Sequence, residues 1–205
     1  MTFKTEQENF WHGAFGDNYA DRCRGEAILA ARLSLWSRIL RTCDSVSSIT
    51  EFGANIGLNL MALHQLLPQA KLHGVEINAK AAAQLDALGF VDVAQGSLLD
   101  TAPQHPSDLA FTCTVLIHIN PEALHTAYAQ LAKAAKRYAV ICEYYSPEPT
   151  QISYRGHDER LFKRDFAGEF MDTHPQFTLR DYGFAYHRDR TFPMDDFNWF
   201  LMERR

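Results

Sequence analysis

Hydrophobic positions along the chain change several times between the spacing of strands and that of helices. Short apolar runs typical of buried strands occupy residues 46–51, 71–77, 90–94, part of 108–119, and 138–144. Apolar residues at helical spacing lie between these runs at 58–67, 79–88 and 121–136, and before the first run, where Leu29, Leu33, Trp36 and Leu40 recur. Strands that alternate with helices form right-handed crossovers, so the pattern predicts a mainly parallel sheet with helices on both faces.

Local signals mark where several of these helices begin and end. Pro68 stops the helix over 58–67, and Gly89 ends the Ala-rich helix over 79–88. Asn120 is an N-cap residue, and Pro121 occupies the first position of a helix that we expect to reach about Lys136. These boundaries support the division of the chain into alternating strands and helices.

The last part of the chain departs from this alternation. Residues 177–187 and 197–203 are strand-like runs joined by a turn region around Pro193, with no helical pattern between them. Two such runs predict an antiparallel hairpin at one edge of a sheet that then has seven strands. No repeat or Gly/Ser linker divides the chain. We therefore expect one Rossmann-like α/β domain over residues 1–205, with an N-terminal lid and helix in 1–41 and an insertion in 145–176.

Composition and charge narrow the class of protein. Apolar residues make up 46% and charged residues 22%, as in soluble globular proteins. The formal net charge of −5 argues against a nucleic-acid binder, and no apolar run is long enough to span a bilayer. The first residues are polar and lack the apolar stretch of a signal peptide, so we expect none. The cysteines show neither a CxxC pair nor the spacing of zinc ligands. We expect a cytoplasmic protein without membrane, nucleic-acid or metal partners, whose four cysteines are reduced: Cys23, Cys43, Cys113 and Cys142.

A glycine-containing turn, Glu51-Phe52-Gly53-Ala54-Asn55-Ile56-Gly57, follows the first strand. Glycines here let the backbone pass close beneath a ligand and start a helix tightly. The turn is not the dinucleotide GxGxxG motif, because Asn55 stands at the second glycine position and the last glycine comes one residue early. It resembles the acidic-x-Gly-x-x-x-Gly turn of class I S-adenosylmethionine-dependent methyltransferases. Glu51 suits that ligand, since a carboxylate receives the ammonium group of a methionine moiety but repels a pyrophosphate.

The second and third strand ends extend this candidate cofactor site. Glu76 ends the second strand roughly 20 residues after the turn, where an acid grips ribose hydroxyls in nucleoside-binding folds. Ile77 beside it can flank an adenine. Ser97 and Leu98 follow the third strand, where the resemblance places adenine contacts, although many methyltransferases carry an Asp at the position of Ser97. The structural alternatives are a tight βα connection, a solvated strand-end acid and an ordinary turn.

The fourth strand contributes residues 111–119. Its carboxyl end should lie beside the transferred methyl group, because ligands in such sheets bind outside those strand ends. We expect Thr114 to contact the cofactor. His118 either orients the acceptor, acts as a base or simply packs with its ring hydrogen-bonded.

Three stretches resemble the pseudaminic acid biosynthesis-associated methylases, a subgroup of class I methyltransferases. They run through residues 6–19, 143–166 and 181–189, and the middle one contains Glu143-Tyr144-Tyr145-Ser146-Pro147 and Leu161-Phe162-Lys163-Arg164-Asp165-Phe166. With the cofactor motifs between them, the resemblance covers nearly the whole chain. It implies S-adenosylmethionine as the cofactor and an association with nonulosonic sugars of surface glycans, and it leaves the acceptor itself open.

The insertion after the fifth strand is rich in groups suited to acceptor binding. Loops at the ligand edge of a sheet usually carry specificity. We expect Tyr144, Arg155, Lys163 and Arg164 to bind the acceptor, which the basic residues suggest is an anionic sugar or nucleotide sugar. The alternative is a charge-rich loop paired to its own acidic residues. The aromatic and polar segment 2–24 either forms a lid over the site or packs on the helix behind it.

Methyl transfer to such an acceptor is an in-line displacement that chiefly needs alignment and desolvation. A sugar hydroxyl also needs a base, for which Tyr145, His118 and His157 are candidates, whereas an amine must only arrive neutral. Other readings remain: methylation of another small molecule, a protein or RNA; a nicotinamide-dependent sugar oxidoreductase; and a catalytically silent cofactor-binding module. The sequence does not determine the oligomeric state.

Overall fold

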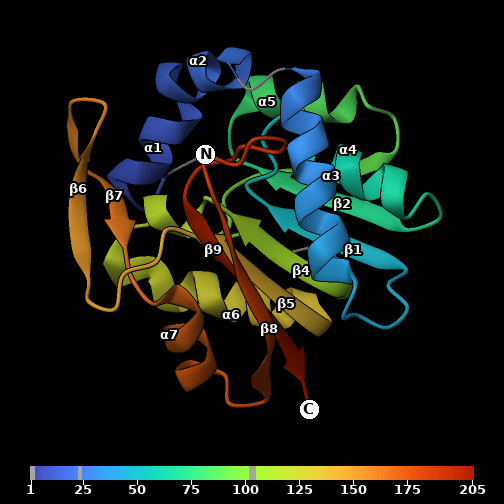
Figure 1. The fold of residues 1–205 in the computed structure, drawn as a ribbon. Coiled ribbons are helices and arrows are strands. Elements are labelled where there is room, and N and C mark those ends of the chain that lie inside the picture. The colour runs from blue at the N-terminus through green and yellow to red at the C-terminus, as the bar shows by residue number, and fades with distance from the viewer. Residues whose placement is uncertain (1–2, 23–24, 102–104) are drawn as a thin grey trace.

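The computed structural model describes residues 3–22, 25–101 and 105–205. Its centre is a seven-stranded sheet in the spatial order β3-β2-β1-β4-β5-β9-β8 (Figure 1). The strands are β1 (Ser48–Phe52), β2 (Lys71–Glu76), β3 (Val91–Gln95), β4 (Ser107–Cys113), β5 (Ala135–Glu143), β8 (Phe177–Ala185) and β9 (Phe197–Arg204). The first five run parallel, β9 pairs antiparallel with β5, and β8 pairs antiparallel with β9. The seven-stranded sheet with its terminal hairpin, as predicted from the sequence, is confirmed.

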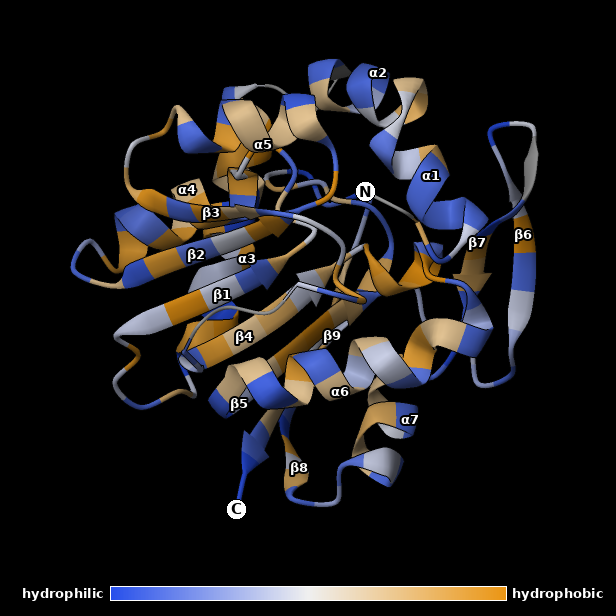
Figure 2. Cartoon of the chain, turned by 180° about the vertical axis from the view of Figure 1, so that it is seen from behind, coloured by the Kyte–Doolittle hydropathy of each residue, from blue (hydrophilic) through white to orange (hydrophobic). Residues whose placement is uncertain are grey.

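Helices cover both faces of the sheet, as predicted. The side chains of α3 (Glu26–Leu40), α4 (Leu58–Leu66) and α5 (Ala79–Asp86) pack on one face, and those of α6 (Leu124–Ala134) and α7 (Phe166–Thr173) on the other. β4 lies between the two layers, and nearly every residue of it is buried; its apolar character is visible in Figure 2. A strand covered on both faces has no polar side, which explains its continuous apolar run in the sequence.

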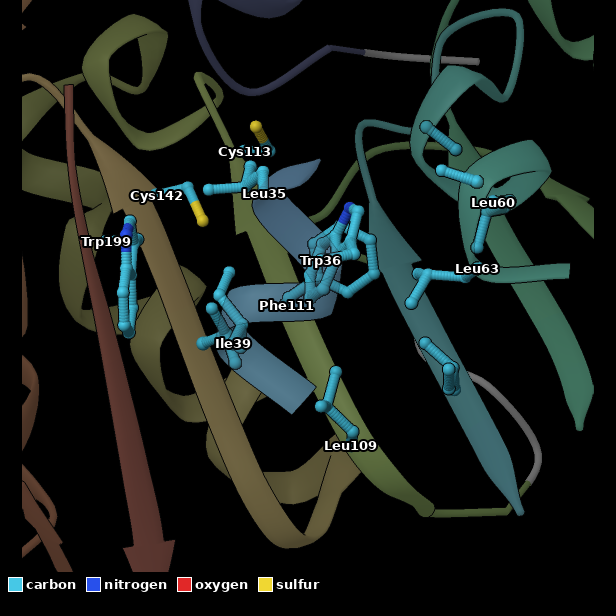
Figure 3. Close-up of a cluster of buried hydrophobic side chains, with 14 of the residues drawn as sticks. Leu35, Trp36, Ile39, Leu60, Leu63, Leu109, Phe111, Cys113, Cys142 and Trp199 are labelled. Atoms are coloured by element: carbon cyan, nitrogen blue, oxygen red, sulfur yellow. The ribbon is translucent and has the colours of Figure 1, made fainter. Parts of the chain in front are cut away.

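The core between α3 and the sheet also supports the ligand edge. Trp36 of α3 lies over Phe111 of β4 with ring centroids 4.4 Å apart (Figure 3). Its indole Nε1 donates to Oδ1 of buried Asn59 on α4 at 3.1 Å. Cys113 and Cys142 lie opposite each other on β4 and β5, and both are buried with free thiols. Cys43 is half-buried and also has a free thiol. The remaining cysteine, Cys23, lies outside the described residues.

The fourth strand is shorter than its apolar run suggests. β4 ends at Cys113, and the run continues as the 3-10 turn η1 (Leu116–His118). Thr114 has φ +56°, which turns the chain out of the strand. The carboxylate of Glu143 at the end of β5 then accepts the backbone N–H groups of Val115 and Leu116, both at 3.0 Å. These tertiary contacts override the strand pattern of the local sequence.

The helix after Asn120 also differs from the prediction. Asn120 caps as expected, accepting the N–H of Glu122 at 2.9 Å, but it caps a short 3-10 turn, η2 (Pro121–Ala123), before α6 begins. The helix ends at Ala134, earlier than predicted, because β5 starts at Ala135 without a loop. Arg204 of β9 donates to the carbonyl oxygens of Ala132 and Ala135 at 2.7 and 3.0 Å, which stabilises this junction.

Two regions without a clear sequence period are ordered. The N-terminal segment forms α1 (Glu6–His12) and α2 (Ala14–Arg22), and α1 begins with a capping box between Thr5 and Glu8. The insertion forms the hairpin β6 (Thr150–Tyr154) and β7 (His157–Lys163), followed by α7. Figure 1 shows α1 and α2 beside the carboxyl ends of the parallel strands, with β6 and β7 next to α1. In the described residues, no helix has the length and apolar character needed to cross a membrane.

Candidate functional site

A cavity lies at the carboxyl ends of β1 to β4 and is covered by α1 and α2. Residues from all four strand ends, from the first two helices and from α3 line it. Eight of the nine residues predicted from the sequence to bind a cofactor line this cavity: Glu51, Gly53, Asn55, Glu76, Ile77, Ser97, Leu98 and Thr114. Their placement agrees with a common ligand, and their individual roles stay predictions.

The turn after β1 uses its glycines in two ways. Gly53 (φ +71°) lies so close to Val115 that a Cβ there would be 2.4 Å from Cγ2 of that residue. Gly57 (φ +87°) is the N-cap of α4 and is not among the lining residues; a Cβ there would meet Leu85. Asn55 also adopts a positive φ of +48°. The turn thus brings its backbone to the cavity at Gly53 and starts the helix at Gly57.

Glu51 places an incompletely satisfied carboxylate in the cavity wall. Its side chain is 1% exposed, and Oε1 accepts a hydrogen bond from Nδ2 of Asn59 at 2.6 Å. Oε2 is buried and has no hydrogen-bond partner among the described residues. Burial raises the pKa of Glu51 well above its ordinary value, while the bond from Asn59 opposes that rise. A buried carboxylate oxygen without a partner is costly, so it indicates a cationic or donor group that arrives with a ligand.

Arg32 of α3 is a site residue that the sequence interpretation missed. Its Nη1 donates to Sγ of Cys113 at 3.2 Å, whereas its buried Nε has no partner among the described residues. Burial opposes its charge, but Cys113 and Glu51 outweigh burial and raise the Arg32 pKa. The missed signal was an arginine on the apolar stripe of a helix, between Leu29 and Trp36 at helical spacing.

Glu76 at the end of β2 is held by backbone donors. Oε2 accepts the N–H of Asn55 and Oε1 accepts the N–H of Asn78, both at 2.7 Å. Burial raises its pKa, and these hydrogen bonds oppose the rise. A carboxylate offers about four lone-pair positions, so each oxygen still has capacity for a ligand hydroxyl.

Asn78 connects this carboxylate to the N-terminal helices. Its Oδ1 caps α5 by accepting the N–H of Ala81, and its Nδ2 donates to the carbonyl oxygens of Trp11 and His12 and to Oδ1 of Asp17. On the other side of the cavity, Nε2 of Gln7 donates to the carbonyl oxygen of Glu159 in β7. Residues 6–22, called the lid below, are therefore anchored at two edges of the cavity.

His118 of η1 is neutral and fixed in orientation. Its Nδ1 lies 2.5 Å from the carbonyl oxygen of Arg160, so Nδ1 carries the proton and Nε2 is the ring's acceptor. Its ring lies 4.6 Å from that of Trp11 and 5.1 Å from that of Tyr154. The side chain is 9% exposed, and burial lowers its pKa to about 4. His118 lines the cavity, which a base or an acceptor-orienting residue must do.

Glu143 at the end of β5 is a second residue without an assigned role in the sequence interpretation. Besides Val115 and Leu116, it accepts the N–H of Ile117 at 3.3 Å and so holds the turn that carries His118. Burial raises its pKa to about 8. The feature of the sequence that could have identified Glu143 is an acidic residue at the end of an otherwise apolar strand.

The predicted acceptor residues lie away from this cavity. Arg164 donates from Nε to Glu169 at 2.8 Å, Lys163 Nζ lies over the ring of Tyr144 at 5.4 Å, and Arg155 lies over Tyr154 at 5.7 Å. Tyr145, a predicted base, is exposed and packs near Phe200. The insertion instead reaches the cavity edge through other residues, Tyr154, Glu159 and Arg160.

The predicted roles of Tyr144, Tyr145, Arg155, Lys163 and Arg164 thus stay predictions without a contact to the cavity lining. The side chain of His157 lies outside the described part of the structure. Within the described residues, no group of histidine, cysteine or acidic side chains is placed to hold a metal ion.

Comparisons with known proteins identify the fold. No protein-family model matches the sequence, and no similar protein is found in the curated set. Among solved structures, magnesium protoporphyrin IX methyltransferase from Synechocystis PCC 6803 with bound S-adenosylmethionine superposes with a TM-score of 0.70 at 12% identity, covering 100% of both chains. The 1,6-didemethyltoxoflavin-N1-methyltransferase from Burkholderia thailandensis, with bound S-adenosylhomocysteine, gives 0.74 at 14% identity, covering 100% of this chain and 91% of that one.

A sugar N-methyltransferase from Streptoalloteichus sp. ATCC 53650 gives a TM-score of 0.66 at 14% identity, covering 95% of this chain and 94% of that one. These likenesses cover 95–100% of this chain. The chain therefore has the Rossmann-like fold of class I methyltransferases.

Proposed function

We propose that this protein is an S-adenosylmethionine-dependent methyltransferase that acts on a sugar. The observation that carries the proposal is a pair of buried side-chain atoms in the cavity that have no hydrogen-bond partner among the described residues, Glu51 Oε2 and Arg32 Nε. The α-amino and α-carboxylate groups of a methionine moiety are complementary to this pair, since the carboxylate binds the ammonium and the guanidinium binds the carboxylate. The pair therefore fits the amino-acid end of the cofactor.

The remaining lining residues fit the nucleoside end. Glu76 has acceptor capacity for the two ribose hydroxyls and is fixed by its backbone donors. Ile77 and Leu98 supply apolar surface for an adenine ring. Residues of the N-terminal helices line the cavity and would keep water from a bound sulfonium centre, which would strengthen the electrostatic contacts inside it.

When bound, the cofactor would supply an electrophilic methyl group that is already activated. The chain's own contribution is to orient, desolvate and deprotonate the acceptor. Neutral His118 offers Nε2 as a proton acceptor, and Glu143 holds the turn that carries it. A hydroxyl acceptor needs that base, whereas an amine that arrives neutral needs only the alignment.

For the acceptor class, we propose a hydroxyl or amine of a surface-glycan sugar of the nonulosonic acid type, or of its precursor. This rests on the resemblance of residues 6–19, 143–166 and 181–189 to the pseudaminic acid-associated methylases. The sugar N-methyltransferase among the similar structures shows that this fold accommodates a sugar acceptor in another protein. We propose a cytoplasmic location, which agrees with the free thiols of Cys43, Cys113 and Cys142.

The test is calorimetric titration with S-adenosylmethionine and S-adenosylhomocysteine. We expect micromolar binding that is lost in Glu76→Ala and kept in Asp92→Ala, which removes an exposed carboxylate from the neighbouring strand. Thermal unfolding of both variants checks that they fold. Absence of binding to folded wild-type protein would refute the proposal, and nicotinamide cofactors would then be titrated.

A second assay tests the acceptor. The protein is incubated with S-adenosylmethionine labelled in its methyl group and with nonulosonic sugars or their nucleotide forms, and products are identified by mass spectrometry. Transfer to one of these sugars supports the acceptor class. Cofactor binding without transfer to any sugar, together with transfer to a peptide, an RNA or a non-sugar metabolite, would overturn it.

A further inference from the structure

Glu8 on the lid is a buried carboxylate that is only half satisfied. The side chain is 4% exposed. Its Oε2 accepts the backbone N–H groups of Lys4 at 2.7 Å and Thr5 at 2.9 Å, as part of the capping box of α1. Its Oε1 is buried and has no hydrogen-bond partner among the described residues, and Glu8 lines the cavity. A buried carboxylate oxygen without a partner is costly, so we infer that a ligand supplies its hydrogen-bond donor.

The position of Glu8 along the cavity follows from a chain of contacts. The side chain of Lys4, whose N–H is bound by Glu8, forms an ion pair with Asp100. The N–H of Asp100 in turn donates to the carbonyl oxygen of Ser97 at 3.0 Å. These contacts place Glu8 towards the end of the cavity formed by the turn after β3, whereas Arg32 and Glu51 belong to α3 and the end of β1.

The turn after β3 does not offer a free carboxylate of its own in the cavity. Ser97 Oγ already accepts the N–H of Leu99 at 3.0 Å, which leaves its hydroxyl proton as a donor. Asp100 at this turn is not among the lining residues and pairs with Lys4. An adenine at this end presents an exocyclic amino group with two N–H donors, so it needs a further acceptor beside the one lone pair that is left on Ser97 Oγ.

We propose that Glu8 accepts a hydrogen bond from the 6-amino group of the cofactor's adenine and so selects adenine over other bases. The inference rests on the proposed function, because it assumes that the adenosyl cofactor occupies this cavity. It assigns base selection to the lid, in place of the Asp that many class I methyltransferases carry where this chain has Ser97.

Glu8→Gln tests this assignment without disturbing the helix. Glutamine serves the capping box as well as glutamate does, and its carbonyl oxygen must face the N–H groups of Lys4 and Thr5. Its amide NH₂ then occupies the position of Oε1 and points a donor into the cavity. The change converts an acceptor into a donor while keeping size and shape.

The experiment compares S-adenosylhomocysteine with S-inosylhomocysteine, whose base has a carbonyl oxygen in place of the amino group. Calorimetric titration measures the dissociation constants of both ligands for wild type and Glu8→Gln. We expect wild type to prefer the adenine ligand by about 10- to 100-fold, because a hydrogen bond to a charged partner is lost with inosine. Glu8→Gln should lower that preference at least about 10-fold or reverse it. Glu6→Gln on the exposed side of the same helix is the matched control and should behave as wild type.

The outcomes separate the two proposals. An unchanged adenine preference in folded Glu8→Gln overturns the role of Glu8 and leaves the cofactor assignment intact. Equal binding of both ligands by wild type overturns it too, without reliance on any variant. Failure of wild type to bind either ligand refutes the proposed function itself, and the inference with it.

Discussion

His118 makes the stability of this protein sensitive to mild acid. Its ring is buried and donates from Nδ1 to the carbonyl oxygen of Arg160, and burial lowers its pKa from 6.5 to about 4. In the unfolded chain the same imidazole titrates near its ordinary pKa. Between those two pH values the unfolded state binds a proton that the folded state does not bind. The free energy of unfolding therefore decreases as the pH falls through this range.

The size of the effect follows from the two pKa values. Proton binding to the unfolded imidazole lowers the free energy of unfolding by about 0.2 kcal/mol at pH 7 and by about 2.6 kcal/mol at pH 4.5. Both figures come from the ratio of the proton-binding polynomials of the unfolded and folded states. The expected loss in unfolding free energy on acidification is therefore about 2.4 kcal/mol from this one side chain. A domain of ordinary stability unfolds with only about 5–15 kcal/mol, so the loss is measurable.

The assay is urea unfolding of wild type and His118→Gln at several pH values from 7 to 4.5. Glutamine keeps an amide N–H that can donate to the Arg160 carbonyl, but it does not titrate. Effects of all other groups cancel in the difference between the two proteins. We expect the wild-type advantage to shrink by roughly 2 kcal/mol over this range. Parallel loss of stability in both proteins would show that folding does not lower the pKa of His118 and would refute this reasoning.

Three further predictions concern the cavity walls and the lid. Gly53→Ala should destabilise the fold by about 1–3 kcal/mol in urea unfolding, because it places a Cβ against Val115 at φ +71°; an unchanged midpoint would refute the close approach. Asn78→Ala removes three hydrogen bonds to the lid and should speed proteolytic cleavage within residues 6–22 several-fold, which mass spectrometry of the fragments would locate. The hydrogen bond from the neighbouring thiol and the nearby guanidinium lower the pKa of Cys113, whereas burial raises that of Cys43 to about 11. The alkylation rate of Cys113, which lines the cavity, should therefore reach half its maximum at a lower pH than that of Cys43, whatever the absolute rates, and S-adenosylhomocysteine should slow the reaction of Cys113; a lower midpoint for Cys43 would contradict the electrostatics.

The order and kind of the central elements were determined by the sequence itself. Local spacing of apolar residues gives strands and helices directly, and right-handed crossovers leave few ways to arrange them. The turn from Glu51 to Gly57 and the acid at Glu76 were recognisable because each lies next to its strand in the chain. Parallel strand ends meet at one edge of the sheet, so these residues come together for reasons that the pattern already contains.

The lid and the insertion were decided by tertiary contacts. α1 and α2 are short and have no clear period, and they are held by Asn78 and by the β7 backbone, which lie far away in the sequence. Arg155, Lys163 and Arg164 are predicted acceptor ligands because of their charge, and that role stays a prediction; only the fold decides that their side chains lie against aromatic rings and Glu169. Conversely, Arg32 and Glu8 became candidate ligand contacts only because each is buried and has one atom without a partner in the described part of the chain. A hydrogen-bond deficit exists only in three dimensions, because it depends on every group that folding brings within reach.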